Sequence, residues 1–176
     1  MKRQARPERS HEGPERRSQP DRRCSSGEQR AVRALRTLSA GNRTLLRATD
    51  EAQLLQAMCQ VIVEEGGYRV SSVGYAEHDE SKVIRVKACA GMDPALLKAL
   101  PLTWADTEMG QWAVATAIRT GQPSVGRHLL TEPSYASIRA YALRAGYAAA
   151  SAFPLVVDGE VIGRSEERRV GKECRL

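Results

Sequence analysis

The sequence predicts an α+β fold built around a central antiparallel sheet. Three observations lead to this prediction. Two amphipathic helical patterns come first, β-prone runs follow in neighbouring pairs, and an Asp-Gly dipeptide joins the last pair. Strands joined by short turns run antiparallel, so one such sheet with helices packed on it accounts for the whole order of elements.

The first helical pattern spans residues 28–48, where apolar residues recur at three- and seven-residue steps between arginines. Gly41 and Asn42 lower the helix propensity of its centre. The apolar face has two candidate partners, a second copy of the chain or the chain's own domain, and the pattern does not choose between them. The residues expected at a dimer contact are Val32, Leu35, Leu38 and Leu45.

A second helix is expected to begin at Asp50, because Asp50 and Gln53 have the spacing of an N-cap residue and its reciprocal partner. Gly66-Gly67 is expected to end it, as glycine commonly does. The runs 68–76 and 83–90 are rich in β-prone residues and predict a hairpin with a polar loop.

The segment after Gly91 is less regular and predicts short elements bounded by proline or glycine. Helices are expected at 94–100, 108–119 and 134–144, and an edge strand is expected at 123–130.

The last predicted strands, 148–157 and 160–163, flank Asp158-Gly159, which is a strong hairpin signal. The second of them stops after about four residues, short of the usual strand length. We therefore expect the last strand to be incomplete.

Both ends of the chain are expected to lie outside the domain, which spans 28–163. Residues 1–27 hold three prolines, eight basic residues and almost no aliphatic residues, which predicts a disordered basic segment. A basic arm that contacts nucleic acid or anionic lipid is the alternative. Residues 164–174 resemble the in-frame translation of a common DNA-sequencing adapter, so we interpret 164–176 as a non-native tail, with a charged helix as the alternative.

The net charge of +6 resides in these two ends, because the middle, 28–163, has as many acidic as basic side chains. Nucleic-acid binding by the core is therefore not expected. No apolar stretch is long enough to span a membrane, and the N-terminus is charged where a signal peptide would be apolar. A cytoplasmic protein is the simplest expectation.

The sequence does not predict an enzyme, because it shows no nucleophile-base pair, phosphate-binding loop or cluster of metal ligands. Cys59 and Cys89 lie among apolar neighbours and are expected to be small buried hydrophobes. His128 follows Arg127 and could contact an anionic ligand, but no catalytic partner can be assigned to it.

Five short strings have the order and spacing of a known family. They are Arg33–Ser39, Ala48–Glu51, Gly74–Asp79, Ala117–Pro123 and Phe153–Leu155. Together they resemble the GAF domain, the small-ligand sensor module of bacterial signalling proteins, over about residues 33–163. The resemblance implies that the two early helices lie on one face of the sheet and that the segment 91–148 covers the other.

Between sheet and cover, such domains hold a pocket for cyclic nucleotides, chromophores or other small molecules, and they usually adjoin a histidine kinase, a diguanylate cyclase or another sensor module. Aromatic walls suit a small planar ligand. The ligand-binding residues expected from the resemblance are Trp104, Trp112, Tyr135, Tyr141 and Phe153. Core packing would explain each of them equally well when taken singly.

Two function classes therefore remain open. The first is a regulatory domain that senses an unidentified small molecule and forms a homodimer through its first helix. The second is a ligand-free dimerisation or spacer module whose pocket is filled by its own side chains.

The sequence departs from the family pattern in three places. Met109–Trp112 replaces a more glycine-rich stretch, and His128 stands where an acidic residue is expected. The rest of the last strand and the C-terminal helix of the family are lost after Gly163. The third departure would leave neighbouring strands with unpaired backbone groups, so the chain is expected to be unstable or to aggregate.

Overall fold

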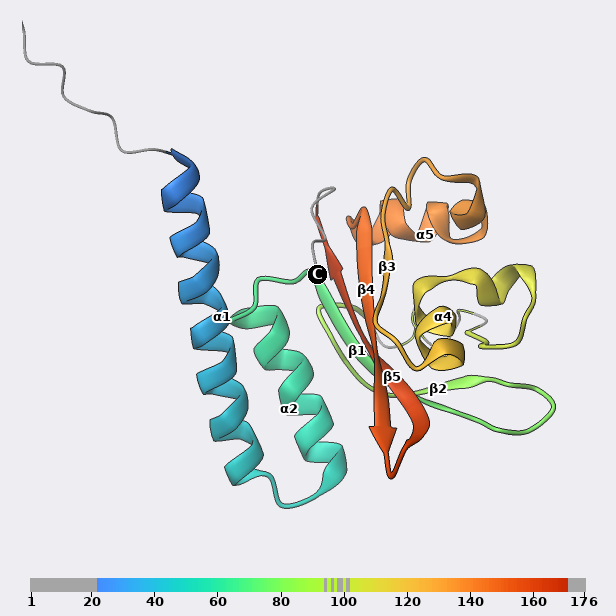
Figure 1. Ribbon diagram of the computed structural model, residues 1–176, viewed down its shortest axis with the longest axis horizontal. Helices are drawn as coiled ribbons and strands as arrows, with labels where there is room; N and C mark the ends of the chain where they lie inside the picture. Colours follow the sequence, from blue (N-terminus) through green and yellow to red (C-terminus); the bar gives the residue numbers. More distant parts are fainter. Residues whose placement is uncertain (1–21, 94, 96, 98–99, 101, 171–176) are drawn as a thin grey trace, which may run out of the picture.

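A computed structural model describes residues 22–170, except 94, 96, 98, 99 and 101. Its centre is a five-stranded antiparallel sheet in the order β2-β1-β5-β4-β3 (Figure 1). The strands are β1 (Val70–Ala76), β2 (Ile84–Ala90), β3 (Ser124–Gly126), β4 (Ala149–Val157) and β5 (Glu160–Arg169). The predicted fold class is confirmed.

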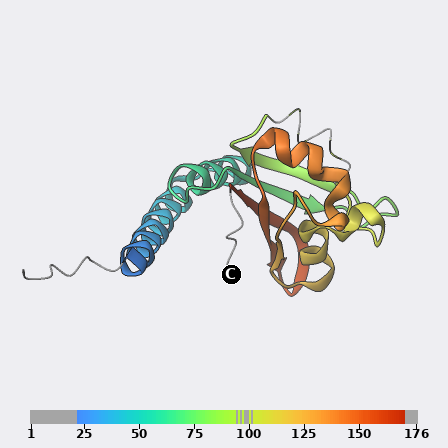
Figure 2. The same ribbon diagram turned by 90° about the horizontal axis from the view of Figure 1, so that it is seen from above.

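Helices lie on both faces of this sheet, as Figures 1 and 2 show. On one face α2 packs against β1 and β2, and α1 packs against the outer side of α2. On the other face lie α4, α5 and two short 3-10 helices. The helices are α1 (Arg22–Arg47), α2 (Glu51–Glu64), η1 (Glu108–Gln111), α4 (Ala113–Thr120), η2 (Pro133–Tyr135) and α5 (Ala136–Ala145). No helix of the described residues is long and apolar enough to cross a membrane.

Helix α1 begins earlier than expected. The predicted disorder of residues 1–27 is wrong for 22–27, which continue the helix, because extending a helix costs much less than nucleating one. The helix is also continuous through its centre, where Gly41 and Asn42 lower the helix propensity. Gly41 is buried against α2, and an added Cβ there would lie 3.3 Å from Cε of Met58. The rest of the basic segment, the helix expected at 94–100 and the end of the C-terminal tail lie largely or wholly outside the described residues.

The capping signal of α2 is confirmed. Oδ1 of Asp50 accepts a 2.8 Å hydrogen bond from the backbone N–H of Gln53. The Gln53 side chain reaches back to the N–H of Thr49, at 2.9 Å. These bonds satisfy donors that the first turn of a helix leaves unpaired.

The single helix expected at 108–119 is instead two elements, η1 and α4, separated at Trp112 with an extended ψ of 162°. The side chain of Arg119 stabilises this break in the helix. Nη1 of Arg119 donates hydrogen bonds to the carbonyl oxygens of Gly110 at 2.5 Å and Trp104 at 3.1 Å. Carbonyls held by this guanidinium need no helical partner, so the helix begins afresh at Ala113.

The expectation that the last strand ends after Gly163 is wrong for this structure, because β5 continues to Arg169 between β1 and β4. Ser72 of β1 and Ala152 of β4 both pair with Glu166. The physical reason lies in the backbone: the inner edges of β1 and β4 need hydrogen-bond partners, and any extended main chain can supply them. Backbone pairing with β5 therefore joins β1 and β4 into one continuous sheet.

Candidate functional site

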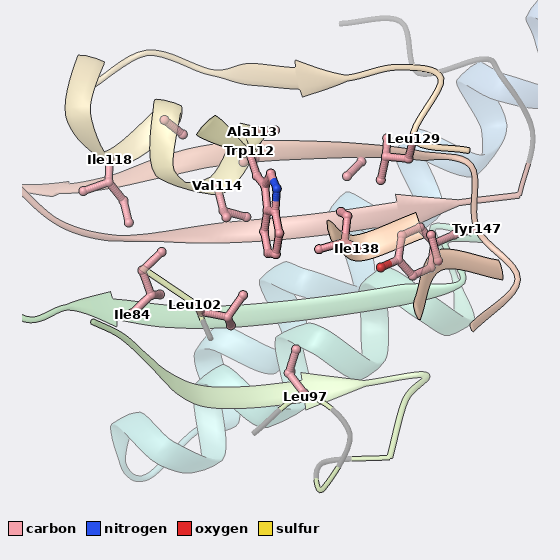
Figure 3. Packing of buried hydrophobic residues seen from close by; sticks show 14 residues of the cluster. Ile84, Leu97, Leu102, Trp112, Ala113, Val114, Ile118, Leu129, Ile138 and Tyr147 are labelled. Carbon is pink, nitrogen blue, oxygen red and sulfur yellow. The ribbon is translucent and has the colours of Figure 1, made fainter. Parts of the chain in front are cut away.

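A buried apolar layer fills the space between the sheet and the helices α4 and α5 (Figure 3). The indole of Trp112 lies in the middle of it, pointing inward from the start of α4, and the residue is 5% exposed. The larger side chains that make up the layer with it are Ile84, Leu97, Leu102, Val114, Ile118, Leu129, Ile138 and Tyr147. This layer is where the family resemblance placed a ligand pocket.

The indole N–H of Trp112 has no hydrogen-bond partner among the described residues. This group can only donate. Leaving such a donor buried and unpaired costs about 1–3 kcal/mol of stability. The middle of the layer therefore lacks one acceptor, which the oxygen or nitrogen of a bound molecule could supply.

Three of the other expected pocket residues pack against the same layer. Trp104, Tyr135 and Tyr141 are half-buried at its margin. Tyr141 donates a hydrogen bond to Sδ of Met92, and its ring meets that of Tyr147 edge-on at a centroid distance of 6.2 Å. Burial raises the pKa of Tyr135 and of Tyr141, so both hydroxyls are neutral donors at pH 7.

Phe153, the fifth expected residue, is not brought to this layer. Ala152, its neighbour on β4, belongs to the layer, whereas Leu155 packs with Cys59 and Val73 on the α2 side of the sheet. Because successive side chains of a strand point to opposite faces, Phe153 shares the side of Leu155. The structure thus places four of the five expected pocket residues together.

Three charged side chains of β5 extend over the same face of the sheet. Arg164, Glu166 and Arg168 are each at most 4% exposed. Arg168 donates two hydrogen bonds to the Glu166 carboxylate, at 2.7 and 2.9 Å, and Arg164 lies 3.8 Å from that carboxylate. Arg164 also donates to the hydroxyl of Ser72 at 2.7 Å and Arg168 to that of Tyr147 at 2.6 Å.

The charged groups of this cluster shift the pKa values of one another. Burial opposes ionisation of Glu166, but the guanidinium groups of Arg168 and Arg164 outweigh it and lower the pKa of the carboxyl. Burial lowers the pKa of Arg164, whereas Arg168 has its pKa raised by Glu166 despite its burial. The Nε and Nη2 atoms of Arg164 have no hydrogen-bond partner among the described residues.

Sequence reasoning missed these residues because it set 164–176 aside. A signal was nevertheless present, since Arg164, Glu166 and Arg168 alternate along the chain and alternate residues of a strand share one face. Their charges alternate in sign along that face, which is the arrangement of an ion-pair ladder.

A shallow groove of about 520 Å³ lies at another edge of the domain, between α4 and the β4–β5 turn. His78, Trp104 and Arg119 line it together with Glu160. Two neighbours of Trp104 lie against its ring: Lys82 Nζ is 5.0 Å from the ring centroid, and the ring of His78 is 5.3 Å away at a tilt of 56°. The indole N–H is used too, in a 2.9 Å bond to the carbonyl of Glu77, so Trp104 is better explained by packing than by a ligand.

The remaining candidates do not form a reactive centre. Cys59 is buried on the α2 side, and this burial raises the pKa of its thiol, as expected of a structural cysteine. Cys89 is half-buried at the margin of the layer. His128 is exposed in a turn with a φ of 59°, and its carbonyl accepts the N–H groups of Thr131 and Glu132. Within the described ranges, no three His, Cys, Asp or Glu side chains gather as a metal site would require.

The structure is a small α+β domain in which a buried apolar layer lies between an antiparallel sheet and a helical cover. The model of the GAF domain family matches residues 48–164, two thirds of the chain. No curated protein matches the chain. The chain belongs to the GAF domain family.

Solved structures agree with this assignment at low identity, and their likeness concerns the fold. A GAF domain of nlh2 from A. aeolicus is 17% identical, with a TM-score of 0.60 over 80% of this chain and 83% of that one. Free methionine-R-sulfoxide reductase from Neisseria meningitidis, solved with its substrate, is 15% identical, with a TM-score of 0.61 over 80% and 75%. A domain of a two-component sensor histidine kinase from Sinorhizobium meliloti is 16% identical, with a TM-score of 0.54 over 73% and 79%.

Proposed function

We propose that this chain is the regulatory domain of a signal-transduction protein and that it binds a small molecule in the layer between sheet and cover. The unpaired N–H of Trp112 carries the proposal, because it is a buried donor in the middle of the face where GAF domains hold ligands. Family membership and the similarity to a domain of a sensor histidine kinase support the signalling role. The domain itself acts by binding, and an attached histidine kinase or diguanylate cyclase would supply the catalysis.

The surroundings of Trp112 restrict the chemistry of the ligand. It is small, because the layer is lined by large apolar side chains, and it offers at least one acceptor to the indole N–H. The rings of Tyr135 and Tyr141 at the margin favour a flat molecule. Cyclic nucleotides have both properties and are the first probes to test.

The test is titration of the full chain with cyclic AMP, cyclic GMP and methionine sulfoxide, followed by tryptophan fluorescence in a Trp104→Phe variant that leaves Trp112 as the reporter. Saturable quenching or enhancement is expected with one of the three. The same titration of Trp112→Phe, read by calorimetry, should show binding about 5- to 30-fold weaker, because one hydrogen bond of about 1–2 kcal/mol is lost. Unchanged affinity in Trp112→Phe would contradict the assigned site.

A ligand-free dimerisation or spacer module is the second candidate, and a specific observation favours it. The Arg164, Glu166 and Arg168 side chains occupy the face of the sheet that a ligand would use. A domain filled in this way would show no saturable binding with any probe and would act only through contacts of its first helix.

We also propose that the chain forms a homodimer through α1, with Val32, Leu35, Leu38 and Leu45 at the contact. These side chains are 42–66% exposed in the single chain, although all are apolar. Pairing with a second copy would remove this apolar surface from water.

A further inference from the structure

Helix α1 has two distinct faces, and only one of them is covered by the rest of the domain. Ala40 and Gly41 are buried against α2, with Met58 in contact with Gly41. The opposite face presents Leu35 and Leu38, which are 66% and 62% exposed. Figures 1 and 2 show α1 as the outermost helix, with α2 between it and the sheet.

The exposed face has the spacing of a coiled-coil seam. Leu35, Leu38, Asn42 and Leu45 follow one another at steps of three, four and three residues, which is the a-d-a-d order of a heptad repeat. All four are exposed. A seam of this kind matches a second copy of the same helix, whose knobs and holes have the same spacing.

The charges of α1 permit such self-pairing. Counted from Leu35 as an a position, the arginines of α1 fall at the b, c and f positions, away from the seam. They are Arg22, Arg23, Arg30, Arg33, Arg36, Arg43 and Arg47. The e and g positions that flank a seam hold only small or apolar residues between 32 and 48, so like charges do not face each other across the pair.

Asn42 distinguishes between the two orientations of the pair. In a parallel, in-register pair, Asn42 of one chain faces Asn42 of the other, and the two amides can bond to each other. In an antiparallel pair centred on the leucine seam, Asn42 faces Leu38 and its amide is buried without a partner. A single asparagine at an a position is known to specify register and a two-stranded state in this way.

We propose that α1 forms a parallel, two-stranded, in-register coiled coil with a second copy of the chain, and that Asn42 sets its register. This inference rests on the homodimer of the proposed function and adds its geometry. In such a dimer the two copies of the domain lie at the same level along the coiled coil, on opposite sides of its axis.

The first experiment measures the mass of the full chain by sedimentation velocity over a range of concentrations, with Leu38→Glu as the disrupting variant and the off-seam Arg36→Glu as its matched control. A monomer-dimer equilibrium that Leu38→Glu abolishes and Arg36→Glu preserves is expected. A monomer at every concentration overturns both the dimer and the coiled coil, while ligand binding through Trp112 is tested separately by fluorescence.

The second experiment determines the orientation by disulfide formation in a background with Cys24→Ser, Cys89→Ala and Cys174→Ser, whose fold is checked by circular dichroism. Leu35→Cys and Leu45→Cys are prepared singly and as a mixture. Residues 35 and 45 are about 15 Å apart along the helix, far beyond the Cα distance of about 7 Å that a disulfide tolerates. A parallel pair therefore cross-links each single variant to itself, and the exposed off-seam Arg36→Cys serves as the control that does not cross-link.

The outcomes separate the geometry from the dimer. Cross-linking only in the mixture means an antiparallel dimer, which overturns the coiled coil proposed here and leaves the homodimer intact. The role of Asn42 is tested by adding Asn42→Leu, which is expected to permit antiparallel cross-links or a larger oligomer. An unchanged mass and cross-linking pattern in Asn42→Leu would overturn the register role of the asparagine.

Discussion

The guanidinium group of Arg168 lies 4.7 Å from the ring centroid of Tyr147 and donates a 2.6 Å hydrogen bond to its hydroxyl. The same group binds the Glu166 carboxylate through two nitrogens. Arg168 on the central strand β5 thus binds both Glu166 of its own strand and Tyr147, which lies two residues beyond the end of α5. The buried charges of Arg164, Glu166 and Arg168 are therefore stabilised by one another and by the hydroxyl of Tyr147.

Glu166→Ala is expected to destabilise the fold by about 3–5 kcal/mol, because it leaves Arg164 and Arg168 buried without a counter-charge. The free energy of unfolding in urea measures the effect. Glu160→Ala at the exposed end of β5 is the matched control and should change it by no more than about 0.5 kcal/mol. Equal effects of the two variants would contradict the ion-pair cluster.

Apolar side chains of similar size can replace the buried charged side chains of β5 without leaving a charge unpaired. Arg164 and Glu167 carry buried polar atoms that have no hydrogen-bond partner among the described residues. The combined variant Arg164→Leu, Glu166→Val, Arg168→Met is then expected to be as stable as the original chain or about 1–4 kcal/mol more stable. Thermal unfolding of both chains checks this, and a large loss of stability would show that the charges are an integral part of the fold.

The stability of the chain should fall as pH rises from about 4.5 to 7. Burial raises the pKa of Glu167 from its ordinary value of 4.5 to about 7, and one carboxylate oxygen has no hydrogen-bond partner in the described structure. In this window the folded chain keeps a proton that the unfolded chain has lost, so each step up in pH favours unfolding, by about 3 kcal/mol in all. Urea denaturation at several pH values measures the slope.

Glu167→Gln removes the titrating group and should abolish this slope while leaving the loss of stability at lower pH. That loss has the opposite sign because the pKa of Glu166 is lowered, so its stabilising charge disappears only on acidification. A slope that persists in Glu167→Gln would assign the pH dependence to another group.

Arg119→Gln should destabilise the segment between Trp104 and α4. The Arg119 guanidinium holds three carbonyl oxygens of this segment, those of Trp104, Ala105 and Gly110. Hydrogen bonds from a charged donor contribute about 1.5–3 kcal/mol, so a loss of this size is expected, together with a red shift of Trp104 fluorescence in a Trp112→Phe background. Arg43→Gln on the surface of α1 is the control and should leave both signals unchanged.

Local signals predicted those elements whose contacts lie close together in the sequence. The cap at Asp50 and the Asp158-Gly159 turn involve neighbours only, and both appear as expected, the turn with positive φ at both residues. The break at Trp112 could not be predicted in this way, because it depends on Arg119 reaching back to carbonyls that no periodic pattern marks.

The candidate site was predictable in part for a similar reason. The cover residues Trp112, Tyr135 and Tyr141 come from the irregular segment that the family resemblance placed over the sheet. Phe153 lies in a strand, where a single residue of register decides the face, and register depends on pairing with β5. Arg164 and its neighbours are absent from the predicted layer because 164–176 was interpreted as a tail outside the domain. Backbone pairing does not depend on side chains, and it places these residues in the sheet.

The position of β5 has a consequence for the order in which the molecule can form during synthesis. The first hairpin, β1 with β2, and the later pair, β3 with β4, meet only through β5, which is synthesised after the other four described strands. Until residues 160–169 have emerged, the growing chain carries two separate half-sheets, each with an open edge. Each half-sheet exposes strand edges with unpaired backbone groups, so we expect the risk of aggregation to be highest before β5 has emerged.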